Sequence, residues 1–273
     1  MSVIVFAAIF VFSALAALIA TAVLLPILHR CKIFDLPNDR SSHERPTPRG
    51  GGIALIFVAV TIWLAISYDV FDWFEFAESD QTVRWVTGGA VFLALVSWAD
   101  DLKGLNPLIR LASQLGTVVG VMICLPEPLV LFNETIPGWL DQFLIAFLWI
   151  WFINLFNFMD GIDGITPSVT ITLILGVLVI RSLELYPTNW IFEFGIIFSC
   201  LAFLFWNWHP AKIFLGDTGS LPLGLLVSLI TLLPLNQKFT DEIYYLIPII
   251  TLLLPILDTT FAFFRRALKG VSP

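Results

Sequence analysis

Long apolar segments without charged residues constrain this chain more than any other feature of its sequence. A membrane-spanning helix needs roughly 20 consecutive apolar residues. Four segments come close to that length: Ser2–Leu28, Gly50–Tyr68, Gln142–Met159 and Thr218–Gln237. Four more reach it once their polar ends lie at the headgroups: Trp85–Ala99, Leu111–Pro126, Ile165–Ile180 and Phe194–Trp208. Ile243–Phe264, interrupted by Asp258, completes a predicted all-α, multi-pass membrane protein of about nine transmembrane helices.

Composition agrees with a membrane protein. Of the 273 residues, 58% are hydrophobic and 13% are charged, which does not fit a soluble domain. The net charge of −7 argues against a nucleic-acid partner bound through a basic surface. The three cysteines lie far apart in sequence and predict neither a disulfide framework nor a thiolate metal site.

Basic residues fall mainly in alternate connections between the predicted helices. The odd-numbered connections and the C-terminal tail hold 11 of the 14 lysines and arginines, namely Arg30, Lys32, Arg40, Arg45, Arg49, Lys103, Arg110, Lys212, Arg265, Arg266 and Lys269. By the positive-inside rule these connections are cytoplasmic and the N-terminus is external. The first apolar segment lacks a basic n-region and is too long for a signal-peptide core, so we interpret it as a retained helix.

Five aspartates lie at the predicted cytoplasmic ends of the helices: Asp100, Asp101, Asp160, Asp163 and Asp217. The first three would lie at helix C-termini, where the helix dipole disfavours a carboxylate, so a cation must offset them. Carboxylates gathered at one face suit Mg²⁺, with Mn²⁺ as an alternative, and Mg²⁺ keeps positions for substrate phosphates. The pattern therefore indicates phosphoryl transfer.

Structural interpretations of these aspartates remain open. Asp100 and Asp101 could pair with Lys103, although one lysine hardly neutralises two carboxylates. Asp163 could help to start the next helix, although Thr166 and Pro167 already supply an N-cap and a first-turn proline.

Asp217 could simply cap the helix that it begins. Its setting between Gly216 and Gly219 also allows a close backbone approach to a ligand, and a helix N-terminus favours a phosphate.

The first predicted cytoplasmic loop combines cations with a glycine run. His43, Arg45 and Arg49 precede Gly50–Gly52. A basic loop of this kind could serve topology alone. That interpretation leaves unexplained three glycines at the start of a helix, where each costs up to about 1 kcal/mol relative to alanine. We therefore predict anion binding by this loop, through its side chains and through its glycine amides.

Further polar residues lie inside or beside apolar segments. Asn154, Asn157 and Asp160 follow a three-residue spacing that places them on one helix face. The structural alternative for the two asparagines is hydrogen bonding between helices. Asn207, taken alone, reads as a solvated loop residue, and Asp258 either has a function or pairs with Arg265 or Arg266.

Four motifs, taken together, resemble those of one enzyme family. They are Thr47–Gly52, Asp100–Lys103, Asn154–Gly164 and Phe214–Leu221. The chain is similar to the polyprenyl-phosphate N-acetylhexosamine-1-phosphate transferases, glycosyltransferase family 4. The form of Asn154–Gly164 is most similar to the branch that initiates O-antigen or other surface polysaccharides.

The resemblance implies an enzyme of the bacterial inner (plasma) membrane. It would transfer N-acetylhexosamine 1-phosphate from a UDP-sugar to undecaprenyl phosphate and release UMP; homodimerisation is left open. Asp217 would bind Mg²⁺, and Asp100 would deprotonate or orient the lipid phosphate with support from Asp101 and Lys103. Asn157, Asp160 and Asp163 would line the nucleotide site, with Asn207 and Phe214 near the uracil. Asp160 would also be catalytic, together with Asp100 and Asp101, and Asn154 would be a further substrate-binding residue.

In one respect the chain departs from the family pattern. Family members usually continue past the ninth helix into a histidine-containing loop and a further helix, whereas this sequence stops at Pro273. We therefore expect a single domain over residues 1–273 that lacks this end, with a truncated, inactive family member as the alternative. An ion-coupled transporter is a weaker alternative, because the acidic residues gather at one face rather than at the bilayer midplane.

Overall fold

The computed structural model describes residues 3–37, 45–68, 80–125, 128–131, 135–183 and 191–232, with positions 257, 260, 261 and 265. These residues form eight helices and one short hairpin: α1 (Val3–Arg30), β1 (Phe34–Asp35), β2 (Thr47–Pro48), α2 (Gly52–Ser67), α3 (Asp80–Lys103), α4 (Pro107–Cys124), α5 (Gly138–Met159), α6 (Ile165–Leu183), α7 (Ile191–Asn207) and α8 (Asp217–Leu232). The all-α prediction is confirmed for this part of the chain.

Helix lengths differ from those that the apolar segments suggest. Parts of α1, α3, α4 and α5 are long and apolar enough to cross a membrane, whereas α2, α6, α7 and α8 contain apolar segments of fewer than 18 residues. The segments beginning at Gly50 and Thr218 give helices of 16 residues, whereas α3 has 24. The reason is that α3 continues into polar residues at both of its ends. The predicted ninth span lies almost entirely outside the described residues, and the membrane orientation stays a prediction.

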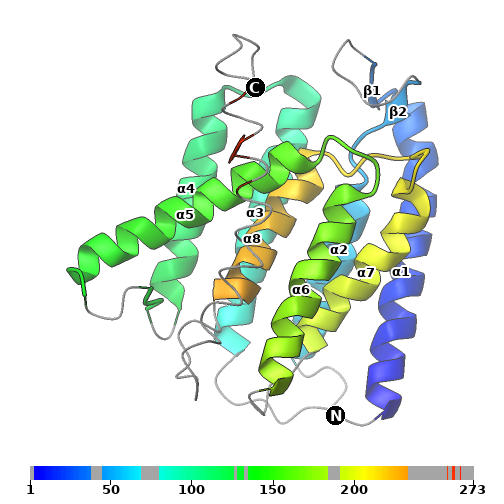
Figure 1. Ribbon diagram of the computed structural model, residues 1–273. Helices are drawn as coiled ribbons and strands as arrows, with labels where there is room; N and C mark the ends of the chain where they lie inside the picture. Colours follow the sequence, from blue (N-terminus) through cyan, green and yellow to red (C-terminus); the bar gives the residue numbers. More distant parts are fainter. Residues whose placement is uncertain are drawn as a thin grey trace.

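Helix α8 occupies the centre of the bundle. It packs against α2, α3, α5 and α6, and its residues from Thr218 to Thr231 are all buried (Figure 1). Two hydroxyl groups in its second half are satisfied within the helix: Ser228 Oγ donates to the carbonyl of Gly224, 2.6 Å away, and Thr231 Oγ1 to that of Val227, 2.9 Å away. Polar side chains can therefore lie in this core without unpaired groups.

The remaining helices surround this centre. Helix α1 packs along α7 and α2 at one side of the bundle, and α5 crosses α8 at a steep tilt (Figure 1). Large apolar side chains point outward, such as Phe12, Ile19 and Leu95, which are 59%, 61% and 63% exposed. Such a surface suits a lipid environment, because apolar side chains facing lipid carry no cost of exposure to water.

The first turns of α2 and α8 touch through two glycines. A Cβ atom added to Gly52 would lie 2.2 Å from the Cα atom of Gly219. Likewise, a Cβ added to Gly219 would lie 2.5 Å from Leu215 Cγ and 2.6 Å from the Cα of Gly52. Backbone therefore packs directly on backbone at this crossing, which brings the N-termini of both helices to one place.

We predict that Gly52→Ala destabilises the folded protein. The new methyl group would meet backbone atoms that cannot move away separately, at a cost of about 1–3 kcal/mol or more. Thermal unfolding of the detergent-solubilised protein measures the effect. Gly138→Ala is the matched control, because no described atom lies within 4 Å of a Cβ at that position. Equal melting temperatures for the two variants would contradict the prediction.

Candidate functional site

Two loops from distant parts of the sequence are joined by backbone hydrogen bonds. The β1–β2 hairpin leads into Arg49, which forms a parallel bridge with Phe214 in the loop between α7 and α8. Phe214 N donates to the carbonyl of Pro48, 2.8 Å away, and its own carbonyl accepts from the amides of Gly50 and Gly51, at 3.2 and 2.8 Å. These bonds set Arg49 beside the N-terminus of α8.

Arg49 lies between two aspartates. Its Nη2 atom is 2.7 Å from Oδ1 of Asp217 and 2.8 Å from Oδ1 of Asp101. Oδ2 of Asp101 accepts from the hydroxyl of Thr218, 2.6 Å away. The C-terminus of α3 is thus tied to the first turn of α8 through one guanidinium group and one hydroxyl group.

Arg110, in the first turn of α4, forms an ion pair with Asp217 as well. Its Nη2 atom lies 3.1 Å from Oδ2 of Asp217, and its Nη1 atom lies 3.1 Å from Oδ2 of Asp100. Oδ1 of Asp100 accepts from the amide of Leu105, 2.6 Å away, in the turn between α3 and α4. Arg110 and Arg49 are therefore the cations that offset Asp100 and Asp101. The structure does not show the alternative, in which these aspartates pair with Lys103.

Burial makes these ion pairs matter for stability. The side chain of Asp101 is 1% exposed, and that of Asp217 is 15% exposed. Burial lowers the pKa of the Arg49 guanidinium, but the carboxylates of Asp217 and Asp101 raise it by more, so the pKa lies above its ordinary value. Arg49 therefore stays charged, and a buried carboxylate that lost it would be left without its partner.

Asp160 lies at the end of α5 and contacts α6. Its Oδ1 accepts from the hydroxyl of Thr166, 2.6 Å away. The residue keeps some exposure, but burial of the carboxyl group, helped by the nearby charge of Asp217, raises its pKa to about 7.

Helix α6 begins at Ile165, and Thr166 donates to Asp160. The prediction that Thr166 caps α6 is therefore wrong, because its hydroxyl serves the carboxylate instead.

The two asparagines of α5 bond to neighbouring helices. Asn154 exchanges hydrogen bonds with Gln114 of α4: its Nδ2 donates to Gln114 Oε1, 2.5 Å away, and its Oδ1 accepts from Gln114 Nε2, 3.2 Å away. Oδ1 of Asn157 accepts from the hydroxyl of Ser220 in α8. The structural alternative, hydrogen bonding between helices, therefore holds for both side chains.

Asn207 is the last residue of α7 and is buried rather than solvated. Its Oδ1 accepts from the amide of Gly164, 3.0 Å away, and its Nδ2 donates to the carbonyl of Ile213, 2.9 Å away. The prediction of a solvated loop residue is wrong, because the amide group bridges the loops that follow α5 and α7. Asn207 thereby holds two candidate substrate-binding loops together.

Asp163 lies in the loop after α5 and contacts the loop after α7. Its Oδ2 lies 2.9 Å from Nδ1 of His209 and accepts from the amide of Ala211, 3.0 Å away. His209 is largely exposed, with 76% of its side chain accessible. The pair lies at the same end of the bundle as Asp217, since both loops lead to that end (Figure 1).

Other predicted site residues differ in how closely they approach the cluster. Lys103 and Arg45 are exposed, and Phe214 is half-buried and contributes its backbone to the loop pairing. His43 and Asp258 lie outside the described residues.

The glycine run has a different role from the one predicted. The amides of Gly50 and Gly51 bond to the carbonyl of Phe214, and the amide of Gly52 to that of Leu215, 2.9 Å away. These donors are therefore used by the neighbouring loop. The run is explained by loop pairing and by the contact of Gly52 with Gly219, which needs the space that a side chain would fill.

The acidic residues of the cluster offer carboxylate oxygens to Mg²⁺. No group of three or more acidic, histidine or cysteine side chains among the described residues is arranged to hold a metal ion. Both oxygens of Asp217 accept from arginine, and Asp101 shares Arg49 with it. Carboxylate oxygens are the ligands that Mg²⁺ prefers, so the donor set fits the metal chemically, while guanidinium groups neutralise it in this structure.

Comparison with known proteins assigns the family. The sequence model of glycosyl transferase family 4 matches residues 83–234, which include Asp100, Asp101, Arg110 and Asp217. The chain belongs to this family. Within it, the chain is a member of the polyprenyl-phosphate N-acetylhexosamine-1-phosphate transferases, which confirms the resemblance seen in the motifs.

The chain is similar in sequence to several proteins that are named as transferases of this kind. The chain is 34% identical, over 95% of its length, to 71% of a Bacillus subtilis (strain 168) protein named "Probable undecaprenyl-phosphate N-acetylglucosaminyl 1-phosphate transferase". It is 30% identical, over 87% of its length, to 64% of a "Decaprenyl-phosphate N-acetylglucosaminephosphotransferase" from Mycolicibacterium smegmatis (strain ATCC 700084 / mc(2)155). A Synechococcus sp. (strain JA-2-3B'a(2-13)) "Phospho-N-acetylmuramoyl-pentapeptide-transferase" is 30% identical over 78% of this chain and 64% of its own length.

The sequence interpretation missed Arg110 as a site residue. Arg110 lies in the first turn of α4, where the helix dipole disfavours a cation. A cation at such a position, placed soon after Asp100 and Asp101 in the sequence, was the available signal. Thr218, Thr166, Ser220 and Gln114 were also missed, since nothing in their spacing identifies a partner so far away in the sequence.

We predict that Arg49→Ala lowers stability by roughly 3–5 kcal/mol, the cost of leaving a buried carboxylate without its partner. Thermal unfolding in detergent measures this change. Asp101→Asn in the same chain should restore much of the loss, because it removes the unpaired charge and keeps an acceptor for Thr218. Additive losses in the double variant would show that the two side chains do not interact.

We predict that Asp160 makes stability depend on pH. Because its pKa is about 7 in the folded protein, against 3.8 ordinarily, the folded state binds a proton that the unfolded chain releases. Stability therefore falls as pH rises through this interval, and the loss is complete above the folded pKa. Without Mg²⁺, Asp160→Asn should match the wild type near about pH 4 and exceed it by roughly 1–3 kcal/mol near about pH 8. A difference that stays constant with pH would refute this.

Proposed function

We propose that this protein transfers a sugar 1-phosphate from a UDP-N-acetylhexosamine to a polyprenyl phosphate. The observation that carries the proposal is the cluster of Asp100, Asp101 and Asp217 held by Arg49 and Arg110 at one end of an apolar helix bundle. A reaction between an anionic lipid and an anionic nucleotide needs both cations and metal-binding carboxylates at the membrane surface. The names of the relatives support the same reaction class.

The two arginines bind the substrate phosphates in this proposal. Each guanidinium bridges two carboxylates and is about one-third exposed, 35% for Arg49 and 32% for Arg110. A planar guanidinium can exchange a carboxylate partner for a phosphate oxygen with the same hydrogen-bond geometry. Arg49 and Arg110 would thus give up part of their carboxylate pairing when the diphosphate and the lipid phosphate enter.

The bond changes in the transfer balance without any further reactant. An oxygen of the lipid phosphate attacks the phosphorus that carries the sugar, and the bond from that phosphorus to the bridging oxygen breaks. UMP leaves with the bridging oxygen, and the lipid keeps a diphosphate linked to the sugar. Asp100, paired with Arg110, accepts a proton from the lipid phosphate or orients it, and Asp101 keeps Arg49 in position.

Mg²⁺ is the proposed cofactor, with Mn²⁺ as a substitute. Asp217 would hold it, since this carboxylate lies at the N-terminus of α8 beside both arginines. The metal would supply neutralisation of the charge that develops on the phosphates. Asp163 and His209 would contact the nucleotide, because their ion pair joins the loops after α5 and α7 at the same end of the bundle as this cluster.

N-acetylglucosamine is the proposed sugar, because the Bacillus and Mycolicibacterium relatives are named for it. The N-acetylmuramoyl pentapeptide in the name of the Synechococcus relative gives the second candidate. Initiation of an O-antigen or another surface polysaccharide, in a bacterial inner membrane, completes the proposal and rests on the form of Asn154–Gly164. The transporter alternative has no comparable support, since the paired carboxylates lie at one end of the helices.

We predict that the protein in membranes exchanges labelled UMP into a UDP-N-acetylhexosamine when Mg²⁺ and a polyprenyl phosphate carrier are present. Asp217→Asn should reduce this exchange at least about 100-fold, because the loss of one preorganised electrostatic group costs that much. The variant should remain folded, since the amide keeps the shape of the side chain. Full exchange by Asp217→Asn at an unchanged Mg²⁺ requirement would refute the metal assignment.

Asp72→Asn is the control for the same assay. Asp72 follows the predicted span Gly50–Tyr68, in an even-numbered connection, which the positive-inside rule places on the external side of the membrane. Its substitution should leave exchange unchanged. Absence of exchange by the wild-type protein under these conditions would refute the proposed activity itself.

A further inference from the structure

The first half of α4, which carries Arg110, buries very little of its surface. Residues 107–116 are all described, and among them Gln114 alone is buried. Leu108, Ile109 and Leu111 are exposed. The one side chain that this segment places inside the bundle is therefore a polar amide, although apolar side chains lie beside it.

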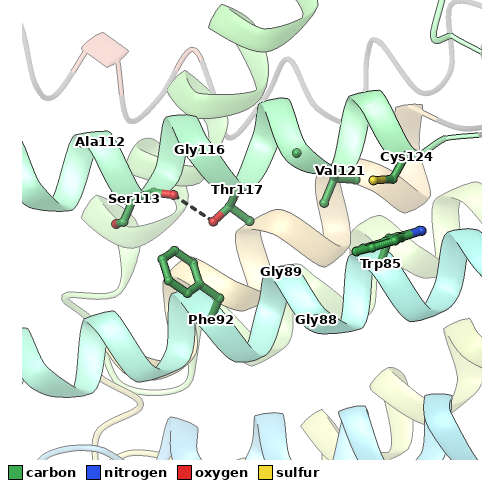
Figure 2. Close-up of a pocket in the computed structure, with 11 residues that line it drawn as sticks. Trp85, Gly88, Gly89, Phe92, Ala112, Ser113, Gly116, Thr117, Val121 and Cys124 are labelled. Carbon is green, nitrogen blue, oxygen red and sulfur yellow. Dashed lines mark hydrogen bonds between the residues drawn. The ribbon is translucent and has the colours of Figure 1, made fainter.

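The side of α4 that faces α3 leaves this segment loosely packed. A pocket of about 430 Å³ lies between the two helices, and its α4 lining includes Ala112, Ser113 and Gly116 (Figure 2). A Cβ atom added to Gly116 would have no described atom within 4 Å. Helix α4 approaches α3 closely at Thr117, whose Cγ2 atom would lie 2.9 Å from a Cβ on Gly89. Apart from the ion pairs of Arg110, the first half of α4 is therefore held mainly from the side of α5.

On that side, a pair of amides joins α4 to α5. Gln114 Oε1 accepts from Nδ2 of Asn154, 2.5 Å away, and Gln114 Nε2 donates to Oδ1 of Asn154, 3.2 Å away. Nδ2 of Asn154 also donates to the carbonyl of Ile150, at 2.8 Å, so both of its hydrogens are used. Two opposed hydrogen bonds fix the rotation and register of one helix against another, which an apolar contact does not.

The same face of α5 also binds α8. Asn157, about one turn further along α5, accepts from the hydroxyl of Ser220, which lies three residues after Asp217. Gln114 likewise lies four residues after Arg110, on the same face of α4. Helix α5 thus holds the two turns whose side chains, Arg110 and Asp217, are 3.1 Å apart.

We propose that Gln114 and Asn154 are positioning residues of the transfer reaction, which hold Arg110 in place when its guanidinium binds the phosphate of the acceptor. The inference rests on the proposed function, in which that phosphate replaces carboxylate partners of Arg110. In the ligand-free protein, Asp100 and Asp217 each fix the guanidinium at 3.1 Å. When those bonds loosen, the amide pair one turn away still holds this part of α4. Asn154, which the sequence predicts to bind substrate, acts through Arg110 instead.

Replacing both amides by leucine separates positioning from stability. Gln114→Leu combined with Asn154→Leu leaves no amide unpaired, and replacing both partners of a buried hydrogen bond by apolar groups costs little stability. In phosphatidylcholine nanodiscs this leucine pair should keep the wild-type melting temperature. Its KM for undecaprenyl phosphate should rise about 10- to 100-fold, because small misplacements of a binding group cost up to about 100-fold. Its KM for the UDP-sugar should stay near the wild-type value.

Reversing the amide pair is the conservative rescue. Gln114→Asn alone is one methylene too short to make both hydrogen bonds, so it should show the same defect in acceptor KM. Adding Asn154→Gln restores the combined length and should recover most of the wild-type KM. These two variants also decide the question if the leucine pair does not fold.

Gln142→Leu is the matched control. Gln142 Nε2 donates to the carbonyl of Leu129, 2.6 Å away, in the first turn of α5. The substitution removes an amide hydrogen bond at the end of α5 remote from Arg110, and it should leave acceptor KM unchanged. A lower kcat at unchanged acceptor KM in the leucine pair would assign the amides to stability alone and overturn the proposal. An equal rise in KM for Gln142→Leu, or no recovery in the reversed pair, would also overturn it.

A binding measurement without turnover separates this inference from the proposed function. Undecaprenyl phosphate should raise the melting temperature of the wild type more than undecaprenol, which has the same chain and no phosphate. The leucine pair should lose this difference. If the wild type catalyses exchange and the leucine pair keeps the difference, the positioning role alone is rejected. If the wild type shows the difference without exchange and the leucine pair loses it, the proposed activity is rejected and the positioning role stands. A wild type with neither property rejects both.

Discussion

The sharing of two arginines among three aspartates is the interaction on which the rest of this end of the molecule depends. Arg49 comes from the loop before α2 and Arg110 from the first turn of α4, and both meet Asp217 at the start of α8. Charges withdrawn from water at a membrane surface are stable only with partners. The pairing therefore fixes the relative positions of four segments at once, and it explains how carboxylates can lie at the C-terminus of α3.

The same pairing holds two guanidinium groups at the site, where they can bind substrate phosphates. A cluster with more carboxylates than arginines attracts a metal ion, whereas its guanidinium groups attract phosphates. These side chains thus pair with one another in the ligand-free protein and would pair with metal or phosphate in the proposed complex. Because the arginines are already held at the required place, substrate binding costs little side-chain conformational entropy.

The sequence alone was enough to predict the fold class and most of the residues at this end. Apolar segments locate helices well, because their signal extends over many residues. Partners were harder to predict: the bond between Asn157 and Ser220, and the role of Asn207 as a bridge between two loops, depend on how helices cross. The glycines of Gly50–Gly52 were assigned to a ligand, whereas the structure uses them for backbone contacts that no local pattern reveals.

Helix α8 is buried on all sides, and its neighbours α2, α3, α5 and α6 all precede it in the chain. During synthesis from the N-terminus, those four helices can therefore assemble before α8 emerges. Helix α8 would then insert into a space lined by protein rather than into lipid. This explains how a short helix containing serine, threonine, glycine and proline can be accommodated in the membrane. Asp217 enters with it, so a chain still being made carries both arginines but cannot yet complete the charged cluster.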